Sequence, residues 1–185
     1  MPKNDWPPLL GDQRALAMAT PPEAARRLIA RLPPGRALEL CCGVGGLTRF
    51  LARDRQVLAV DGDPERLALA RANVAAMGGA TGVDFLCCDL ERPAITPRPG
   101  LFRLAILDPD WAPAGQPPNA WTDDLAQMRP PADALLRWAQ GFRCTIILRL
   151  PPWPSQGRFI NFGYFHTLTF RQNGREKFAW IIWGN

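Results

Sequence analysis

A glycine-rich loop between an expected strand and an expected helix constrains this chain more than any other feature. The loop begins with the carboxylate of Glu39 and leads into residues 47–53, which have the pattern of a helix. Within it, Gly43, Gly45 and Gly46 carry no Cβ, so the backbone can lie directly against a ligand. The free N–H groups at a helix N-terminus attract anionic groups. The loop therefore predicts a site for a nucleoside-bearing cofactor, either a dinucleotide or S-adenosylmethionine.

Two details of the loop favour S-adenosylmethionine over a dinucleotide. The dinucleotide fingerprint G-x-G-x-x-G requires a glycine where this chain has Thr48. Glu39 also puts a negative charge close before the first glycine, where it would repel a pyrophosphate. The same charge suits the amino group of a methionine moiety.

Aspartates end three further segments that have the composition of buried strands. These are Asp61, Asp89 and Asp108. Because the carboxyl ends of parallel strands meet at one edge of a sheet, we expect the three carboxylates to line one crevice. Asp61 is placed to accept hydrogen bonds from a ribose diol, and Asp89 to accept one from an adenine amine. Each aspartate alone could equally cap a turn or a helix, but their serial arrangement favours the cofactor site.

Three segments resemble the motifs of class I S-adenosylmethionine-dependent methyltransferases. They are residues 37–48, 60–64 and 108–111, and the stretch at 20–23 is similar to the start of the helix that precedes the family's glycine loop. More narrowly, these motifs resemble those of the trimethylguanosine synthase family, which methylates the N2 amine of guanine in RNA. The chain departs from that pattern at Leu47, where the family has asparagine, and at Asp110, where it has a second proline.

The resemblance implies an α/β fold, namely a Rossmann-like, doubly wound and mostly parallel sheet with a C-terminal antiparallel hairpin. The implied strand order is 3-2-1-4-5-7-6. Residues 1–19 are then an N-terminal extension, and residues 20–185 form a single methyltransferase domain.

The chemistry of methylating an amine suggests roles for the turn at residues 108–111. The Asp108 carboxylate and the Pro109 carbonyl would accept the N–H bonds of an exocyclic amine, and the flat face of Trp111 would stack on its base. Asp110 would either help to accept the amine proton or pair with a nearby arginine. The cofactor-binding residues that we predict, with no metal ligands among them, are Glu39, Cys41, Gly43, Gly45, Thr48, Asp61, Gly62 and Asp89.

Residues typical of helix caps and turns predict the boundaries of the remaining helices and strands. Thr20 is expected to cap a helix that ends near Leu32, with Glu23 completing a capping box. A further helix should span 64–74, and a broken helical stretch 121–140. We expect a fifth strand over 142–150 and a hairpin of strands 162–170 and 177–183, which are joined by the turn signal Asn173-Gly174.

Composition adds limits on partners and location. The 185 residues suit one domain, and they include no apolar run long enough to span a membrane and no signal-peptide pattern at the N-terminus. The five cysteines read as buried, reduced thiols, as expected of a cytoplasmic protein. A net charge of +5 permits RNA as a partner, although the scattered arginines could equally form solvated helix faces.

The sequence thus predicts an S-adenosylmethionine-dependent methyltransferase for an exocyclic amine of a purine, with guanine N2 in RNA as the favoured acceptor. Another amine acceptor, such as DNA adenine, a protein glutamine or a small molecule, remains an alternative. Asp110 and the short linker at 151–156 also leave open a non-catalytic S-adenosylmethionine-binding module. A nicotinamide-dependent oxidoreductase is a more distant reading.

Overall fold

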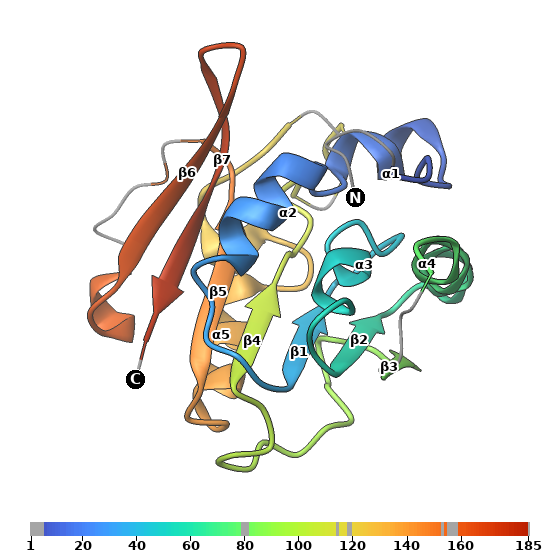
Figure 1. Cartoon of the computed structure of the whole chain (residues 1–185). Coiled ribbons are helices and arrows are strands. Elements are labelled where there is room, and N and C mark those ends of the chain that lie inside the picture. Colours follow the sequence, from blue (N-terminus) through green and yellow to red (C-terminus); the bar gives the residue numbers. More distant parts are fainter. Residues whose placement is uncertain are drawn as a thin grey trace.

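The computed structural model describes residues 6–78, 82–113, 115–117, 120–152, 154 and 159–184. Its centre is a seven-stranded sheet with the order β3-β2-β1-β4-β5-β7-β6, as predicted (Figure 1). The strands are β1 (Ala37–Leu40), β2 (Val57–Asp61), β3 (Val83–Cys87), β4 (Leu104–Leu107), β5 (Thr145–Leu150), β6 (His166–Gln172) and β7 (Arg175–Trp183). The first five are parallel, and β7 runs antiparallel to both β5 and β6.

Helices cover both faces of the sheet (Figure 1). These are α2 (Pro22–Ile29), α3 (Thr48–Leu51), α4 (Pro64–Ala76) and α5 (Ala132–Gln140), whereas α1 (Gln13–Met18) lies above the carboxyl ends of the strands. Short 3-10 turns are η1 (Leu125–Gln127) and η3 (Ile160–Phe162). Alternate residues of β1 face opposite layers. Leu38 and Leu40 pack in the hydrophobic cluster that contains α5, whereas Ala37 packs with α2 and α3. Strand periodicity therefore turns Glu39 toward the α2–α3 layer.

The C-terminal hairpin forms at the predicted turn. Asn173 and Gly174 have φ values of 51° and 74°, which is the left-handed pair that a two-residue hairpin turn requires. β7 then fills the space between β5 and β6, so Trp180 and Ile181 are almost completely buried.

Several predicted element boundaries are wrong. Thr20 does not cap α2, because the helix begins at Pro22 with Pro21 in the cap position and without a side-chain cap. α2 ends at Ile29, and β5 begins only at Thr145, after Arg143 has adopted a φ of 52°.

Two further differences concern short elements. The helix expected over 47–53 is reduced to α3, and the hairpin strand expected from residue 162 begins at His166. Inside the predicted N-terminal extension, Asp12 caps a helix that we did not predict, α1, by accepting a hydrogen bond from the Ala15 N–H at 2.7 Å.

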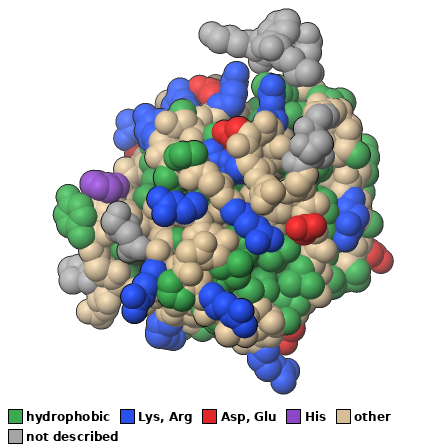
Figure 2. Space-filling model, turned by 60° about the horizontal axis from the view of Figure 1, so that its bottom comes forward, with side chains coloured by type: hydrophobic (Ala, Val, Ile, Leu, Met, Phe, Trp, Pro, Cys, Tyr) green, Lys and Arg blue, Asp and Glu red, His purple; other side chains and the backbone are tan. Residues whose placement is uncertain are grey.

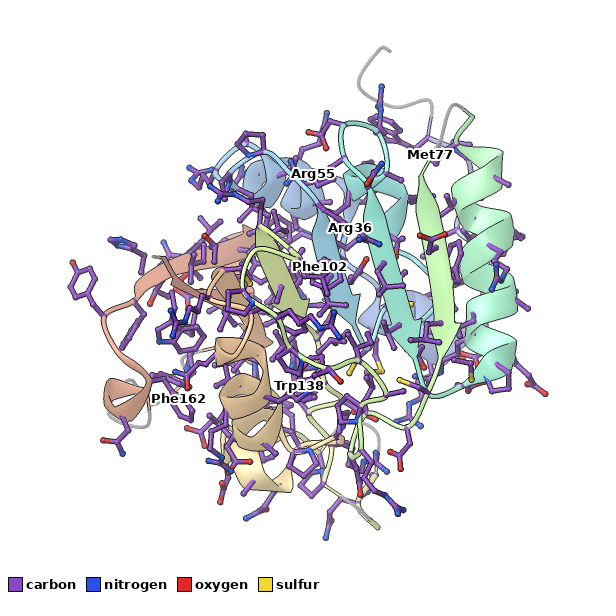
Figure 3. All side chains as sticks on the ribbon, turned by 90° about the horizontal axis from the view of Figure 1, so that it is seen from below. Arg36, Arg55, Met77, Phe102, Trp138 and Phe162 are labelled. Atoms are coloured by element: carbon purple, nitrogen blue, oxygen red, sulfur yellow. The ribbon has the colours of Figure 1, made fainter. Side chains whose placement is uncertain are left out.

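Basic side chains on the face at the amino ends of the parallel strands lie singly among other residues (Figure 2). Viewed from below, Arg36 and Phe102 lie on this side, and the Arg36 guanidinium stands 5.2 Å from the centre of the Phe102 ring (Figure 3). Arg55 pairs with its neighbour Asp54 at 2.8 Å. The basic side chains on this face are therefore scattered and form no continuous basic patch in this view. Within the described residues, no helix is long and apolar enough to cross a membrane.

Candidate active site

A cavity of about 1130 Å³ lies at the carboxyl ends of β1, β2 and β4, and we call it the main cleft. α1 crosses its mouth above these strand ends (Figure 1). Ten of the twelve predicted site residues line it: Glu39, Cys41, Gly43, Asp61, Gly62, Asp89, Asp108, Pro109, Asp110 and Trp111.

Two predicted cofactor residues do not line the main cleft. A Cβ on Gly45, which has a φ of 79°, would come within 3.1 Å of the Ala70 backbone, so this glycine allows the loop to approach α4 closely. Thr48 is fully buried at the start of α3. Both residues therefore support the loop from behind instead of facing a ligand.

Glu39 is a buried acid that points into the main cleft. Its side chain is 2% exposed, and its Oε2 has no hydrogen-bond partner among the described residues. The pKa of Glu39 is raised to about 8, chiefly by burial and in smaller part by the charges of Asp108 and Asp61, against the lowering effect of a hydrogen bond with Thr48. A buried acceptor without a donor is costly, so the site is built for a cationic or N–H-bearing ligand at this point.

Asp61 holds the glycine loop. Its Oδ2 accepts from the Gly43 N–H at 2.7 Å and its Oδ1 from the Asp63 N–H at 3.0 Å. Each carboxylate oxygen has a second lone pair, so the side chain can also accept from a diol. Gly43 has a φ of 54°, and a Cβ there would meet nothing within 4 Å. The bare loop backbone therefore borders open space beside an acceptor carboxylate.

The turn after β4 is organised by Arg149 in β5, a residue that the sequence analysis missed. Its Nη1 donates to Asp108 Oδ2 at 2.8 Å, and its guanidinium carbon lies 5.1 Å from the Trp111 ring centre and 4.1 Å from that of Phe178. Trp111 Nε1 donates back to the Arg149 carbonyl at 3.2 Å. An arginine within the apolar run of β5 was the available signal, because a buried charge needs a partner.

Arg149 also affects the protonation of the turn. Burial raises the pKa of Asp108, and the Arg149 charge opposes that rise. The same Nη1 donates to the Met18 carbonyl at 2.8 Å and lies 3.5 Å from the Thr20 hydroxyl. Thr20 therefore contacts the site instead of capping a helix.

Asp110 pairs with two arginines. Its Oδ2 accepts from Arg14 at 2.6 Å and from Arg129 at 3.0 Å, and its Oδ1 accepts from the Ala112 N–H at 3.0 Å. Its backbone also forms an isolated bridge with that of Arg129. Of the two roles that we expected for Asp110, pairing with arginine is present.

The comparisons with known proteins bear on this geometry. A family model described as a methyltransferase domain matches residues 37–109, which hold the glycine loop and the ends of β1, β2 and β4. Precorrin-8w decarboxylase of Methanobacterium thermoautotrophicum superposes with a TM-score of 0.64 at 19% identity, covering 90% of this chain and 91% of that one.

The chain has the class I S-adenosylmethionine-dependent methyltransferase fold. The predicted cofactor, S-adenosylmethionine, agrees with the methyltransferase description of this family model. A glycopeptide N-methyltransferase, MtfA, complexed with this cofactor superposes with a TM-score of 0.59 at 14% identity, covering 86% of this chain and 85% of that one. At these identities the likeness concerns the fold.

Curated relatives resemble only part of the chain. The 23S rRNA (uracil(1939)-C(5))-methyltransferase RlmD of Shewanella amazonensis is 41% identical over 76 residues, which are 40% of this chain and 17% of that protein. A relative of the same name in Xanthomonas campestris is 38% identical over 89 residues, 46% of this chain and 20% of that protein. The chain thus spans about a fifth of the length of these relatives.

The residues of the main cleft fit S-adenosylmethionine. The unpartnered Glu39 carboxylate suits the amino group, the open backbone at Gly43 suits the methionine moiety, and Asp61 suits the ribose. Asp89 is exposed at the edge of the cleft, where it accepts from the Glu91 N–H at 2.9 Å and lies 3.5 Å from Arg92. The adenine contact of Asp89 stays a prediction.

Replacing Asp61 by alanine should weaken S-adenosylhomocysteine binding by about tenfold or more, since a hydrogen bond to a charged group contributes about 1.5–3 kcal/mol. Asp63 is the matched control. It caps α4 by accepting from the N–H groups of Glu65 and Arg66, so Asp63→Ala should cost helix stability and leave affinity nearly unchanged. Titration calorimetry of both variants checks this, and equal affinities would contradict the role of Asp61.

Glu39 should give the ligand-free protein an unusual pH dependence. Its folded-state pKa of about 8 lies above the unfolded value of about 4.3, so the unfolded state loses its proton first as the pH rises. The contribution of Glu39 to the free energy of unfolding therefore decreases between about pH 4 and pH 8. Glu39→Gln should flatten this part of the pH profile in thermal melts, whereas Glu65→Gln on the exposed side of α4 should not. A profile unaltered by Glu39→Gln would refute the raised pKa.

Proposed function

We propose that this protein is an S-adenosylmethionine-dependent methyltransferase that methylates an exocyclic amine of a base in RNA, with N2 of guanine as the favoured acceptor. The observation that carries the proposal is the position of the turn at residues 108–111. It lines the same cleft as Glu39 and Asp61, so acceptor groups for an amine stand beside the cofactor site.

The cofactor, when bound, supplies an activated methyl group on a sulfonium sulfur. The work left to the protein is to place the amine in line and to exclude water. The lone pair of an exocyclic amine is delocalised into the ring, and acceptors for its N–H bonds make it more available. Asp108 has one oxygen besides the Oδ2 that is bonded to Arg149, and Pro109 offers its carbonyl. These two groups are our candidates for holding the amine.

Trp111 is suited to hold the acceptor base. It lines the main cleft, and its Nε1 hydrogen bond to the Arg149 carbonyl fixes the plane of the indole. Base stacking on an aromatic side chain contributes about 1–3 kcal/mol. A target base in a folded RNA would have to leave its stack to reach this ring.

The thiols of the cleft favour an amine over carbon C5 of uracil, the acceptor atom in the name of RlmD. Carbon C5 becomes nucleophilic when a nucleophile adds to the adjacent C6, and a thiolate is suited to that step. Cys41 and Cys42 line the cleft, but burial raises the pKa of both thiols well above the usual 9.0, and neighbouring carboxylates, Asp61 for Cys41 and Glu39 for Cys42, raise it further. Both therefore stay protonated.

Charge at the cleft supports RNA as the substrate. Five basic residues line the main cleft among six acidic ones, and the chain as a whole has a net charge of +5; the basic residues are Arg14, Arg66, Arg129, Arg149 and Lys177. Cationic side chains around a cavity attract a polyanion. The named relatives of the glycine-loop region act on 23S rRNA, which agrees with this substrate class.

The test is transfer of labelled methyl from S-adenosylmethionine to RNA from cells that lack this protein, followed by mass spectrometry of the nucleosides. N2-methylguanosine is the expected product. Formation of 5-methyluridine would overturn the amine acceptor, and a different methylated amine would overturn guanine alone. Binding of S-adenosylhomocysteine without transfer to RNA, DNA or protein would favour the non-catalytic module.

A further inference from the structure

Two arginines converge on one carboxylate oxygen at the acceptor end of the main cleft. Arg14 and Arg129 both donate to Asp110 Oδ2, at 2.6 and 3.0 Å. The Asp110 side chain is 18% exposed, whereas those of Arg14 and Arg129 are 40% and 42% exposed. Two positive charges against one negative charge leave an excess of positive charge at the mouth of the cleft.

Asp110 holds both guanidinium groups, but their hydrogen bonds do not use all of their N–H donors. An arginine has five N–H donors. Among the described residues, Arg14 makes one side-chain hydrogen bond, to Asp110, and Arg129 makes two, the second from its Nε to the Ala112 carbonyl at 2.8 Å. The remaining donors are available at the cleft mouth in the fork geometry that recognises phosphate.

An exposed aromatic side chain lines the same cleft as this pair. Trp121 lines the main cleft and is 54% exposed. The N–H of the next residue, Thr122, donates to the Trp111 carbonyl at 3.0 Å, which keeps Trp121 next to the turn that bears Trp111. A large exposed indole in a cleft that also holds cationic donors has the composition of a stacking platform for a nucleic-acid strand.

A purely structural role explains these observations less well. If Asp110 served only to connect α1 to the turn, one arginine would be sufficient. Exposed ion pairs also contribute little to stability. The second arginine on the same oxygen adds charge without a further carboxylate. Its use lies in a ligand that carries negative charge.

We propose that Arg14 and Arg129, oriented by Asp110, bind the phosphate next to the target nucleotide, and that Trp121 stacks on the neighbouring base. This inference rests on the proposed function and narrows its substrate to a polynucleotide, since a free nucleoside would lack both contacts. It also assigns a substrate-binding residue, Arg14, to the segment before residue 20.

The test measures binding of a fluorescently labelled oligoribonucleotide, which needs no catalytic turnover. Arg14→Gln and Arg129→Gln should each weaken binding by about tenfold, as expected for a charge-assisted hydrogen bond. Each should also reduce the slope of log affinity against log salt by about 0.7. Trp121→Ala should weaken binding by about tenfold. Affinity for S-adenosylhomocysteine should stay within about twofold, because Arg14, Arg129 and Trp121, which we call the clamp, lie outside the predicted cofactor contacts.

Two further variants distinguish specific RNA binding by the clamp from general electrostatic attraction between RNA and the positively charged protein. Arg137 pairs with Asp133 on α5 and does not line the cleft, so Arg137→Gln removes the same charge and should leave RNA affinity unchanged. Asp110→Asn raises the net charge by one, so bulk attraction predicts tighter RNA binding. A clamp oriented by Asp110 predicts weaker binding, and thermal melting checks that each variant is folded.

Each remaining outcome overturns the clamp. If Arg14→Gln and Arg129→Gln bind RNA like the parent protein, the clamp is wrong, while methyl transfer to RNA would still support the proposed function. If the variants keep the RNA affinity of the parent protein and lose only their binding of inorganic phosphate, the site binds a free anion and not RNA. If the parent protein binds no RNA but transfers methyl groups to a small amine, both the clamp and the RNA substrate fail.

Discussion

Replacing Trp111 by alanine should lower methyl transfer by about 10²-fold or more, because a small displacement of the acceptor from the in-line geometry has an effect of that size. The affinity for S-adenosylhomocysteine should stay within a few-fold, since the indole is placed on the acceptor side of the main cleft. Steady-state transfer to RNA and calorimetric titration of the same preparation measure the two quantities. Trp111→Phe, which keeps a ring but loses the hydrogen bond to the Arg149 carbonyl, should lie between the parent and alanine.

If cofactor affinity collapses together with activity in Trp111→Ala, or if the variant unfolds, Trp111 is a packing residue. That result is a real alternative, because one face of the indole lies against the Arg149 guanidinium and the ring touches both hydrophobic clusters.

Replacing Arg149 by methionine should have the largest effect on stability. It leaves the half-buried Asp108 carboxylate without its cation, and breaking a buried ion pair from one side costs about 3–5 kcal/mol. The side chain of Arg149 is 6% exposed and that of Asp108 23%. Because solvent in the cleft reaches Asp108 in part, we expect a loss near the lower end of that range. For a chain of this size such a loss lowers the melting temperature by about 10 °C.

A control variant and a double variant test the same ion pair between Arg149 and Asp108. Arg137→Met removes an exposed partner of Asp133 and should cost less than about 1 kcal/mol. The double variant Arg149→Met, Asp108→Asn should recover part of the stability, because no buried charge remains, but not the methyl transfer. A single Arg149→Met variant as stable as the parent protein would show that this ion pair does not organise the turn.

The pH dependence of stability gives a second measurement on the Arg149→Met variant. Burial already raises the pKa of Asp108, and loss of the guanidinium should raise it further. A folded-state pKa above the unfolded value of about 3.9 means that stability increases as the pH falls toward that value. The deficit of Arg149→Met should therefore shrink as the pH is lowered through the raised pKa of Asp108.

Much of the fold could be predicted from the sequence because the patterns that indicate its strands and its hairpin turn lie within short segments. Apolar runs, each followed by an acid or a glycine loop, fixed the positions of β1, β2, β3 and β4, and Asn173-Gly174 fixed the hairpin. The order of the strands came from the family resemblance. Boundaries failed where tertiary contacts decide, as at Thr20, which had the features of a helix cap but instead lies against Arg149.

The site was predictable only in part, for a related reason. Residues that follow strands, such as Asp61 and Asp108, can be placed from the order of elements alone. Arg149 and Arg14 could not be, because their partners Asp108 and Asp110 lie 41 and 96 positions away. Pairing over such distances depends on how β5 and α1 pack.

The insertion of β7 between β5 and β6 has a consequence for how this protein is made. The turn at residues 108–111 depends on Arg149, whose guanidinium rests on Phe178 of β7 and whose Nη1 donates to the Met18 carbonyl, 131 positions away. During synthesis, residues 13–18 emerge long before β7 exists. Until β7 enters the sheet, β5 has an open edge and Arg149 lacks one of its two aromatic neighbours. The nascent chain should thus carry its complete cofactor loop well before it has a finished acceptor pocket.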